Sequence, residues 1–391
     1  MRRSVLLFYC LVAVCQAAGA SGTAMLAPFF MKKHGFSLAL VGIPLVINGL
    51  GRISSDLLSG ILATYVSTRV LLIVAITVAL VSSLLGMVFR EIMPFFLSLW
   101  VVLGLTEAMF GLSIRKTAFD ESPPDQQGRA QGQIASALGI GFTLGPLAGG
   151  WVGANWGPEN LFIIYALSHT VALTLILIAG GHTGNRSVAR ESETLWREGR
   201  KLLARPSFLA ACLGIFQTFL FLGGVTRVAF PFLAVSRQGL SLDVVGMIVG
   251  VSRLADTIGR LLGGWLSDKV GTRTVILSGV LLTIPMFVFQ VHGTNLLTLL
   301  LPLCFMTLGF GLTNVGGVTC ALQTAGGGAK GLALGLARAS NSTGTMLGPL
   351  LVGVLIEQLD YENAFSAMAL ISLAIFAVIW YGFRREKQRS Q

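Results

Sequence analysis

Long apolar runs constrain this chain more than any other feature of its sequence. Hydropathy and helix-breaking residues predict twelve segments that are long enough to cross the hydrocarbon core of a bilayer as helices. Only 12% of the residues are charged, about half the share in an average soluble domain. That is too little charge for a water-facing surface, so we expect an all-α membrane protein with twelve transmembrane helices. The predicted spans are 4–31, 41–64, 70–89, 93–115, 130–153, 160–180, 207–235, 244–266, 273–292, 295–323, 332–356 and 361–383.

One long connection divides the spans into two sets of six. Residues 181–206 are rich in Arg, Glu and Ser, whereas most other connections are short. We therefore predict an N-terminal six-helix bundle at 1–180, a cytoplasmic linker at 181–206 and a C-terminal six-helix bundle at 207–391.

Lysine and arginine are distributed unevenly between the two sides of the spans. Twelve spans place both termini on one side, and that side carries 19 of the 28 basic residues, against four on the opposite side. By the positive-inside rule we expect both termini in the cytoplasm and the spans in the cytoplasmic (inner) membrane. The net charge of +11 then reflects the orientation of the chain in the membrane, and we expect the basic residues to contact anionic lipid. It does not indicate nucleic-acid binding.

The two halves of the chain repeat each other. Residues 35–73 share 13 identities with 239–277 over 39 positions, and residues 128–162 share 12 identities with 331–365 over 35 positions. Unrelated apolar sequences share some Leu and Gly by composition, but they do not hold a nearly constant offset over such distances. Six spans in each half make the repeat parallel, which suits alternating access around a site at the membrane midplane.

Three motifs carry a resemblance to a known family. The loop between spans 8 and 9 reads Gly-x-x-x-Asp-Lys-x-Gly-x-Arg, with the residues Gly264, Asp268, Lys269, Gly271 and Arg273. Span 5 contains a second motif, made of Gly141, Gly145, Pro146, Gly149 and Gly150. A third stretch, Pro-Pro-x-x-x-Gly-Arg-Ala-x-Gly, places Arg129 just before span 5. With these motifs the chain resembles the major facilitator superfamily, and the second motif resembles that of its drug:proton antiporters.

The resemblance covers the whole chain. It implies the major facilitator fold, in which two pseudo-symmetric six-helix bundles transport a small-molecule substrate, and it suggests an exporter. The first half departs from the loop motif, because Thr64 replaces the acidic residue and Ser67 replaces the glycine. The arginine that family antiporters often carry in span 4 falls at Trp100, so its part in proton coupling is not carried over.

The motifs also have physical reasons. Gly141, Gly145 and Gly149 lie on one helix face at i, i+4 and i+8, so a second helix can approach closely, and Pro146 is expected to kink span 5. We predict that spans 5 with 8, and spans 2 with 11, form a hinge between the halves; generic helix packing is the alternative. Asp268 is predicted to cap a helix N-terminus near Arg129 and to close the cytoplasmic side.

Ionisable residues inside the spans need partners or a wet cavity, because an isolated charge in hydrocarbon is costly. Arg52 with Asp56, and Asp256 with Arg260, are i, i+4 pairs at equivalent positions of the two halves, with the charges exchanged. We interpret both pairs as structural or gating elements, with substrate contact as the alternative.

Glu107 and Arg227 have no opposite charge at i±3 or i±4, and the resemblance places their spans, 4 and 7, at a central cavity. Glu107 is the candidate proton carrier, because a partly buried carboxylate can exchange a proton near neutral pH. Arg227 is the candidate ligand for a carboxylate or phosphate on the substrate. An ion pair between the two is the alternative. Weaker candidates for substrate binding are Gln16, Gln217, Asn314 and Gln323.

The sequence predicts no cofactor and no enzyme. It contains no His, Cys and Asp cluster with metal-ligand spacing, and its Gly-rich stretches lack the ending of a phosphate-binding loop. We expect free thiols at the five cysteines, which all lie in apolar runs. The favoured function is proton-coupled export of a small organic molecule by a monomer. Import, symport or facilitated transport of a small organic anion is the alternative.

Overall fold

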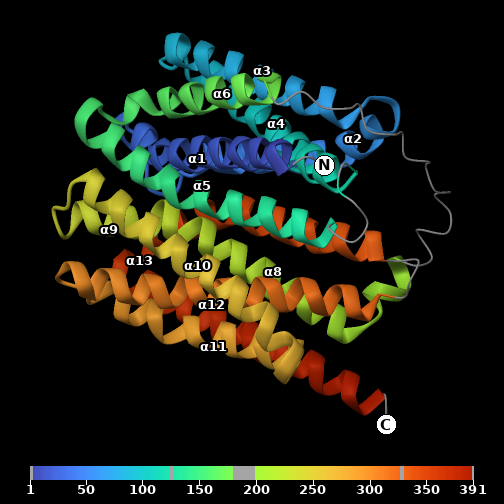
Figure 1. Cartoon of the computed structure of the whole chain (residues 1–391). Coiled ribbons are helices and arrows are strands. Elements are labelled where there is room, and N and C mark those ends of the chain that lie inside the picture. Colours follow the sequence, from blue (N-terminus) through green and yellow to red (C-terminus); the bar gives the residue numbers. More distant parts are fainter. Residues whose placement is uncertain (1–2, 121, 123–126, 179–198, 326–329, 390–391) are drawn as a thin grey trace. The chain divides into compact units, whose positions relative to one another are not determined.

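The computed structural model describes residues 3–120, 122, 127–178, 199–325 and 330–389, and every regular element in these residues is a helix (Figure 1). The prediction of an all-α chain is confirmed. The first helices are α1 (Arg3–Lys33), α2 (Ile43–Tyr65), α3 (Thr68–Phe89), α4 (Met93–Asp120), α5 (Gln127–Trp156), the 3-10 turn η1 (Pro158–Asn160) and α6 (Leu161–Ile178). The later ones are α8 (Pro206–Gly224), the π-helical turn η2 (Val225–Ala229), α9 (Phe230–Ser236), α10 (Leu242–Val270), α11 (Thr272–Val291), α12 (Leu296–Thr324) and α13 (Lys330–Arg389).

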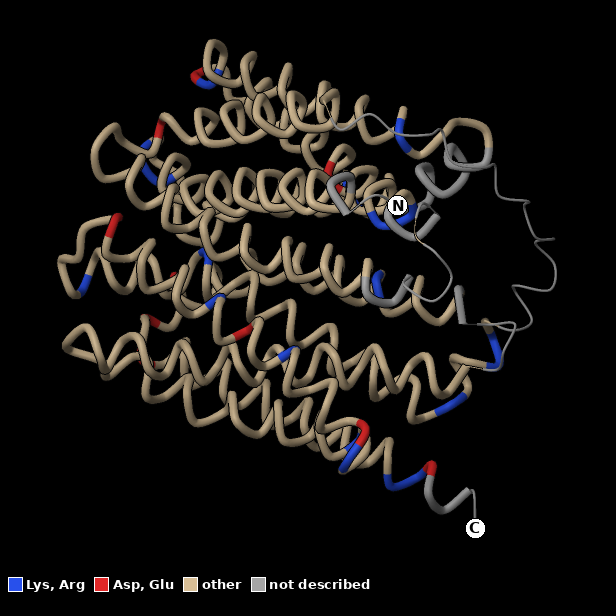
Figure 2. The backbone as a smooth tube through the Cα atoms, viewed as in Figure 1, with Lys and Arg blue, Asp and Glu red and all other residues tan. Residues whose placement is uncertain are grey.

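All twelve predicted spans fall on these helices. Span 7 comprises α8, η2 and α9, whereas spans 11 and 12 both lie in α13, on either side of Asp360. Nine helices in the described part of the chain are long and apolar enough to cross a membrane. Helix α10 is not one of them, and it carries Arg253, Asp256 and Arg260 in its central turns. Along most of the helix lengths charged residues are sparse (Figure 2).

The chain divides into two compact units. Unit 1 consists of Met1–Phe36, Val41–Ala189 and Leu240–Gly250, and unit 2 of Ser37–Leu40, Arg190–Gly239 and Val251–Gln391. The predicted linker falls largely on residues 179–198, which lie outside the described residues, so the predicted domain boundaries stay a prediction.

Helices pair in the same way within each unit. In unit 1, α1 packs against α5 and α6, and α3 packs against α4 and α6. In unit 2, α8 packs against α13, which contains both equivalent spans, and α11 packs against α12 and α13. The internal repeat in the sequence thus corresponds to a repeated set of helix contacts.

Glycine allows the closest of these contacts. A Cβ atom on Gly145 would lie 2.8 Å from the backbone nitrogen of Gly22 in α1, and a Cβ atom on Gly149 would lie 2.7 Å from the Gly22 oxygen. In unit 2, a Cβ atom on Gly348 would lie 3.0 Å from the nitrogen of Gly224 in α8. The glycine face of span 5 therefore serves the contact with α1 of its own unit, where larger residues would force the backbones apart.

Two loop positions need backbone conformations that favour glycine. Gly271, in the loop motif, has a φ of 85° between α10 and α11, while Ser67 at the equivalent place instead caps α3 by accepting the N–H of Val70. Gly157 has a φ of 85°, and its equivalent Asp360 holds a φ of 61°. Asp360 partly offsets this strain, because its Oδ1 accepts the Asn363 N–H at 3.1 Å.

Candidate functional site

Glu107 lies in α4 and faces α2. Its Oε2 atom is 3.9 Å from Nη1 of Arg52, and the two side chains are 16% and 31% exposed. The sequence spacing predicts a pair between Arg52 and Asp56 on one helix, but the Asp56 side chain lies outside the described residues. The contact between α2 and α4 was not predicted, because spacing in the sequence reports neighbours on one helix and not partners on another.

Small residues bring α2 and α4 together at this point. A Cβ atom on Gly104 would meet the carbonyl oxygen of Asn48 and would lie 3.1 Å from the Arg52 nitrogen. A Cβ atom on Gly51 would lie 3.2 Å from the nitrogen of Leu105. The two backbones thus approach closely on either side of Arg52, so that its side chain reaches the carboxylate on α4.

Helix α6 supplies a second partner for Glu107. The hydroxyl of Tyr165 donates to Oε1 of Glu107 at 3.3 Å. His169 follows one turn later and stacks on the Tyr165 ring, with centroids 4.2 Å apart and planes 7° apart. The Nδ1 atom of His169 lies 2.8 Å from the Tyr165 carbonyl oxygen, and its Nε2 atom lies 2.5 Å from the Gln16 side chain of α1.

These five residues, Gln16, Arg52, Glu107, Tyr165 and His169, form what we call the Glu107 cluster. It joins α1, α2, α4 and α6 of unit 1. A carboxyl group held between a guanidinium and a phenol can stay ionised, or it can take up a proton and remain hydrogen-bonded. The arrangement suits proton binding. In the described part of the chain, no group of three or more His, Cys, Asp or Glu side chains is placed to hold a metal ion.

Sequence reasoning found part of this cluster. It singled out Glu107 and Gln16, and the structure adds His169, whose side chain is completely buried. It missed Tyr165, which is 1% exposed. The available signal was the i, i+4 spacing of Tyr165 and His169 in an otherwise apolar helix.

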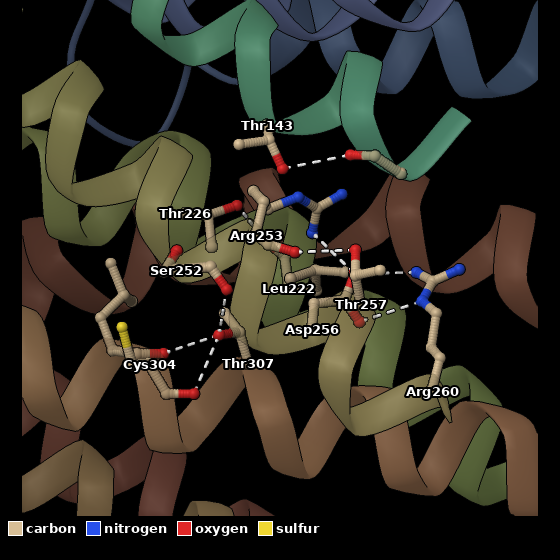
Figure 3. A network of polar contacts seen from close by, with 12 residues as sticks. Thr143, Leu222, Thr226, Ser252, Arg253, Asp256, Thr257, Arg260, Cys304 and Thr307 are labelled. Atoms are coloured by element: carbon tan, nitrogen blue, oxygen red, sulfur yellow. Dashed lines mark hydrogen bonds and ion pairs between the residues drawn. The ribbon is translucent and has the colours of Figure 1, made fainter. Parts of the chain in front are cut away.

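Unit 2 holds its charges differently. Asp256 accepts two hydrogen bonds from Arg260, from Nε at 3.1 Å and from Nη2 at 2.9 Å, and it lies 3.7 Å from Nη1 of Arg253 (Figure 3). The predicted pairing of Asp256 with Arg260 is present, and its gating role stays a prediction. All three side chains of this Asp256 triad belong to α10.

A hydroxyl beside the triad joins α10 to α12. Thr307 in α12 donates to the backbone oxygen of Ser252 at 2.6 Å, and this contact is buried (Figure 3). One turn further along α12, a Cβ atom on Gly311 would meet the oxygen of Asp256 and would lie 2.8 Å from the Arg260 nitrogen. The triad is therefore held on a helix whose backbone packs tightly against its neighbour.

Arg227 lies on a π-helical turn. In the turn η2, the N–H of Phe230 bonds to the carbonyl oxygen of Val225, five residues back. Pro231 follows at once; it has no N–H for the Arg227 oxygen, and its ring crowds that oxygen, so the helix widens there. The equivalent Pro28 lies inside α1 without a π turn. Such turns often occur at functional sites in α-helices, and the sequence pattern does not predict this one.

The remaining substrate-binding candidates lie in different surroundings. Gln217 is 1% exposed and donates to the Ser372 hydroxyl at 2.5 Å, whereas Asn314 is half-buried in α12. Gln323 lies at the end of α12, where its Oε1 accepts from Thr272 beside the loop motif at 3.5 Å. The place of Gln323 next to a loop gives no support to a role in a central cavity.

The residues of the loop motif lie at the end of α10 and the start of α11. Asp268 and Lys269 are exposed in the last turn of α10, and the Lys269 ammonium lies over the Trp265 ring, 3.9 Å from its centroid. Gly264 and Arg273 are half-buried on either side of the loop. The side chain of Arg129, the predicted neighbour of Asp268, lies outside the described residues, so the predicted latch stays a prediction.

Both pairs of spans predicted to form a hinge make contacts inside a unit. Unit 1 includes the start of α10, where a Cβ atom on Gly150 would lie 2.9 Å from the Gly246 Cα atom. Unit 2 includes the residues before span 2, where the Ala39 N–H donates to Glu357 in span 11 at 2.6 Å. The hinge function itself stays a prediction.

A charged network lies at the ends of helices in unit 1. His34 follows α1, and its ring donates to the Phe30 oxygen at 2.9 Å and to the Glu91 carboxylate at 3.0 Å. The hydrogen bond to Glu91 raises the pKa of His34 above 6.5, and the same bond lowers the pKa of Glu91 below 4.5. Arg90 donates to the Glu159 backbone oxygen at 2.8 Å.

The comparisons with known proteins cover nearly all of the chain. The sequence profile described as Major Facilitator Superfamily matches residues 9–241 and 219–391. The chain is 22% identical over 363 residues to "Multidrug resistance protein 2" of Bacillus subtilis, which covers 90% of this chain and 89% of that protein. It is 25% identical over 296 residues to "Probable galactarate/D-glucarate transporter GarP" of Escherichia coli, over 67% of this chain and 66% of that protein.

The solved structures agree with the fold. The crystal structure of a bacterial homolog of the human lysosomal transporter Spinster, inward-facing and occupied, matches with a TM-score of 0.80 at 14% identity. The match covers 98% of this chain and 97% of the other. At this identity the likeness shows the fold alone, and it confirms the predicted architecture of twelve helices.

Proposed function

The chain belongs to the Major Facilitator Superfamily, a family of transporters and not of enzymes, and from this premise we propose that this multi-pass membrane protein exports a small organic molecule in exchange for protons. Two observations support export. The glycine and proline motif of span 5 resembles that of drug:proton antiporters, and one similar protein is named for multidrug resistance. The two repeated units suit alternating access, in which a site opens to one side of the membrane and then to the other.

The setting of Glu107 is the observation that carries proton coupling. It is an acid on an apolar helix, 16% exposed, with Arg52 at one carboxylate oxygen and Tyr165 at the other. An intramembrane carboxylate is costly unless it is paired or serves a function, and it can bind and release protons where water reaches it. We assign Glu107 the role of proton carrier.

Other residues take supporting roles in this proposal. Arg227, on its π-helical turn, binds an acidic group of the substrate, and the Asp256 triad holds α10 together as a gating element. The excess of basic residues at the termini and in the loops on their side supports a cytoplasmic position for both termini, with anionic lipid at that face of the inner membrane. The transporter acts as a monomer.

Proteoliposomes with an imposed pH gradient test the proposal. Norfloxacin, which carries a carboxylate and a basic amine, serves as the probe, and an internal pH dye reports proton movement. We expect norfloxacin flux to run against proton flux. Glu107→Gln should abolish flux driven by the pH gradient yet preserve exchange of labelled norfloxacin across the membrane, whereas Glu362→Gln, at an exposed acid at the start of span 12, should leave both unchanged. A Glu107→Gln variant with unchanged pH dependence would refute the carrier role.

A second candidate function rests on Arg227 and on one relative. The ionisable residues well inside the spans, away from their ends, comprise five Arg against three acids, which favours an anionic or zwitterionic substrate. A similar Escherichia coli protein is named for galactarate and D-glucarate. The alternative is therefore import, symport or facilitated transport of a small organic anion. Labelled D-glucarate in the same proteoliposomes separates the two functions, because uptake together with protons, and loss of uptake in Arg227→Gln, would favour the alternative.

A further inference from the structure

The Glu107 cluster contains a hydroxyl that can serve either protonation state of the carboxyl group. We infer that Tyr165 is a positioning residue, which turns its O–H from Glu107 to Gln16 when Glu107 takes up a proton. The inference rests on the proposed function of Glu107 as a proton carrier. It adds Tyr165, Gln16 and His169 to the residues that take part in coupling.

The direction of the hydrogen bonds follows from His169. Its Nδ1 atom lies 2.8 Å from the Tyr165 carbonyl oxygen, which can only accept, so Nδ1 carries a hydrogen. Its hydrogen-bond partners in the described part of the chain are this carbonyl, the Gln16 amide and the Ser168 hydroxyl, and none of them is acidic. A fully buried imidazolium without an acidic partner is unfavourable, so His169 is neutral and its Nε2 atom accepts.

The orientation of Gln16 follows from that of His169. The structure places Oε1 of Gln16 2.5 Å from Nε2 of His169; because that nitrogen accepts, we assign the NH₂ group of Gln16 to this position instead. The amide oxygen and nitrogen exchange places by a half-turn, and the surrounding hydrogen bonds decide between the two orientations. The Gln16 side chain also interacts with the Tyr165 side chain. The amide oxygen is therefore on the side of Tyr165, where it can accept the phenolic O–H.

Tyr165 then has two acceptors, one for each state of Glu107. The charged and titratable groups that face Glu107 in unit 1 include Arg52 from α2 and Tyr165 from α6, while α1 adds the Gln16 amide. When Glu107 is ionised, Tyr165 donates to its Oε1 and Arg52 lies beside its Oε2. When Glu107 is protonated, its own O–H donates to the Tyr165 oxygen, and the Tyr165 O–H turns to Gln16. Glu107 exchanges its proton with water, and the phenol keeps its own.

The second half of the chain contains a similar polar contact between its first and last spans, but it lacks the carboxyl group. Gln217 in α8 donates to Ser372, which stands at the position equivalent to His169. Met368 stands where Tyr165 does, and Phe310 stands where Glu107 does. The polar bond between the first and last spans of a bundle is thus present in both halves, whereas the phenol accompanies the carboxyl group in the half that contains it.

Infrared titration of the full chain in lipid nanodiscs tests the inference without a known substrate. The carboxylic C=O band that disappears in Glu107→Gln reports the protonation of Glu107. Tyr165→Phe removes the donor to the ionised form, so the midpoint should move to higher pH by about one unit. Gln16→Leu removes the acceptor needed in the protonated form, so the midpoint should move to lower pH. Tyr9→Phe, at another fully buried tyrosine of unit 1, should leave the midpoint unchanged.

The outcomes separate the inference from the function on which it rests. If no carboxylic band depends on Glu107, the proposed carrier role fails. If the band titrates but both variants leave its midpoint in place, the role of Tyr165 is overturned and the carrier role stands. Shifts of Tyr165→Phe and Gln16→Leu in the same direction would also overturn it, because loosened packing alone has no reason to produce opposite signs.

Discussion

The two halves of this chain place charges at equivalent positions and use them differently. Arg52 of α2 corresponds to Asp256 of α10, and Glu107 of α4 corresponds to Phe310 of α12. In unit 1 the charge on α2 meets a carboxylate on another helix. In unit 2 the carboxylate is held by two arginines of its own helix, and the neighbouring helix presents a glycine to the α10 backbone.

Equivalent positions in the two halves of a repeated fold can therefore have different chemical roles. A carboxyl group between helices can take up a proton when its partner is lost or moves away, so unit 1 need not keep an unpaired charge. Arginine stays protonated at any physiological pH, so the two arginines of unit 2 would keep their charges if their partner were lost. We therefore expect unit 1 to be the proton-responsive half and the Asp256 triad to hold α10 together.

The largest expected effect comes from removing the acid of unit 2. Asp256→Asn leaves two guanidinium groups of α10 without their carboxylate, and we expect it to cost about 3 kcal/mol of stability. Arg52→Gln should cost clearly less, because Glu107 can become neutral. Melting curves of both purified variants in one detergent measure the difference. An equal or larger loss of stability in Arg52→Gln would contradict the expected difference between the two units.

A smaller effect is expected at the glycine of α12 that packs against the helix of the Asp256 triad. A Cβ atom on Gly311 would meet the Asp256 oxygen and lie 2.8 Å from the Arg260 nitrogen. We expect Gly311→Ala to lower stability by about 1–3 kcal/mol, since α10 and α12 must move apart. Gly335→Ala in α13 is the matched control, because a Cβ atom there would have no atom within 4 Å. Equal melting temperatures for the two variants would show that the close approach of α10 and α12 is unimportant.

The smallest expected effect compares the helix ends of the two units. In unit 1, His34 pairs with Glu91, and in unit 2, Arg237 pairs with Glu362 at 3.1 Å. Because the folded-state pKa of His34 is raised, its stabilising contribution is complete below pH 6.5 and is lost as the pH rises through the higher folded value. Because the folded-state pKa of Glu91 is lowered, the stabilising contribution of Glu91 is complete above about pH 4.5. It is lost as the pH falls through the lower folded value and Glu91 takes up a proton.

Melting temperatures between pH 5 and pH 9 test this last prediction. The difference between the wild type and His34→Gln should shrink as the pH rises above 6.5, whereas the difference for Arg237→Gln should stay constant, because arginine does not titrate there. A constant difference for His34→Gln would show that its bond to Glu91 contributes nothing that depends on protonation.

Features that depend on local spacing can be predicted from the amino-acid sequence alone. Apolar runs of sufficient length predict all twelve helices, and two nearly constant offsets predict the repeat. The i, i+4 spacing predicts the bond between Asp256 and Arg260, because residues one turn apart lie on the same helix face. The glycine of the loop motif likewise indicates the turn at Gly271, where a positive φ is required.

Which helices share a site becomes clear only from the packed structure. Whether Glu107 meets Arg52 and Tyr165 depends on the rotation and depth of α2, α4 and α6, and glycines such as Gly104 set how closely two of these helices pack. The sequence does not indicate the strained φ of Asp360 either, since the equivalent residue in the repeat is a glycine. Periodicity describes one helix at a time, whereas contacts between helices arise from packing that involves residues distant in the sequence.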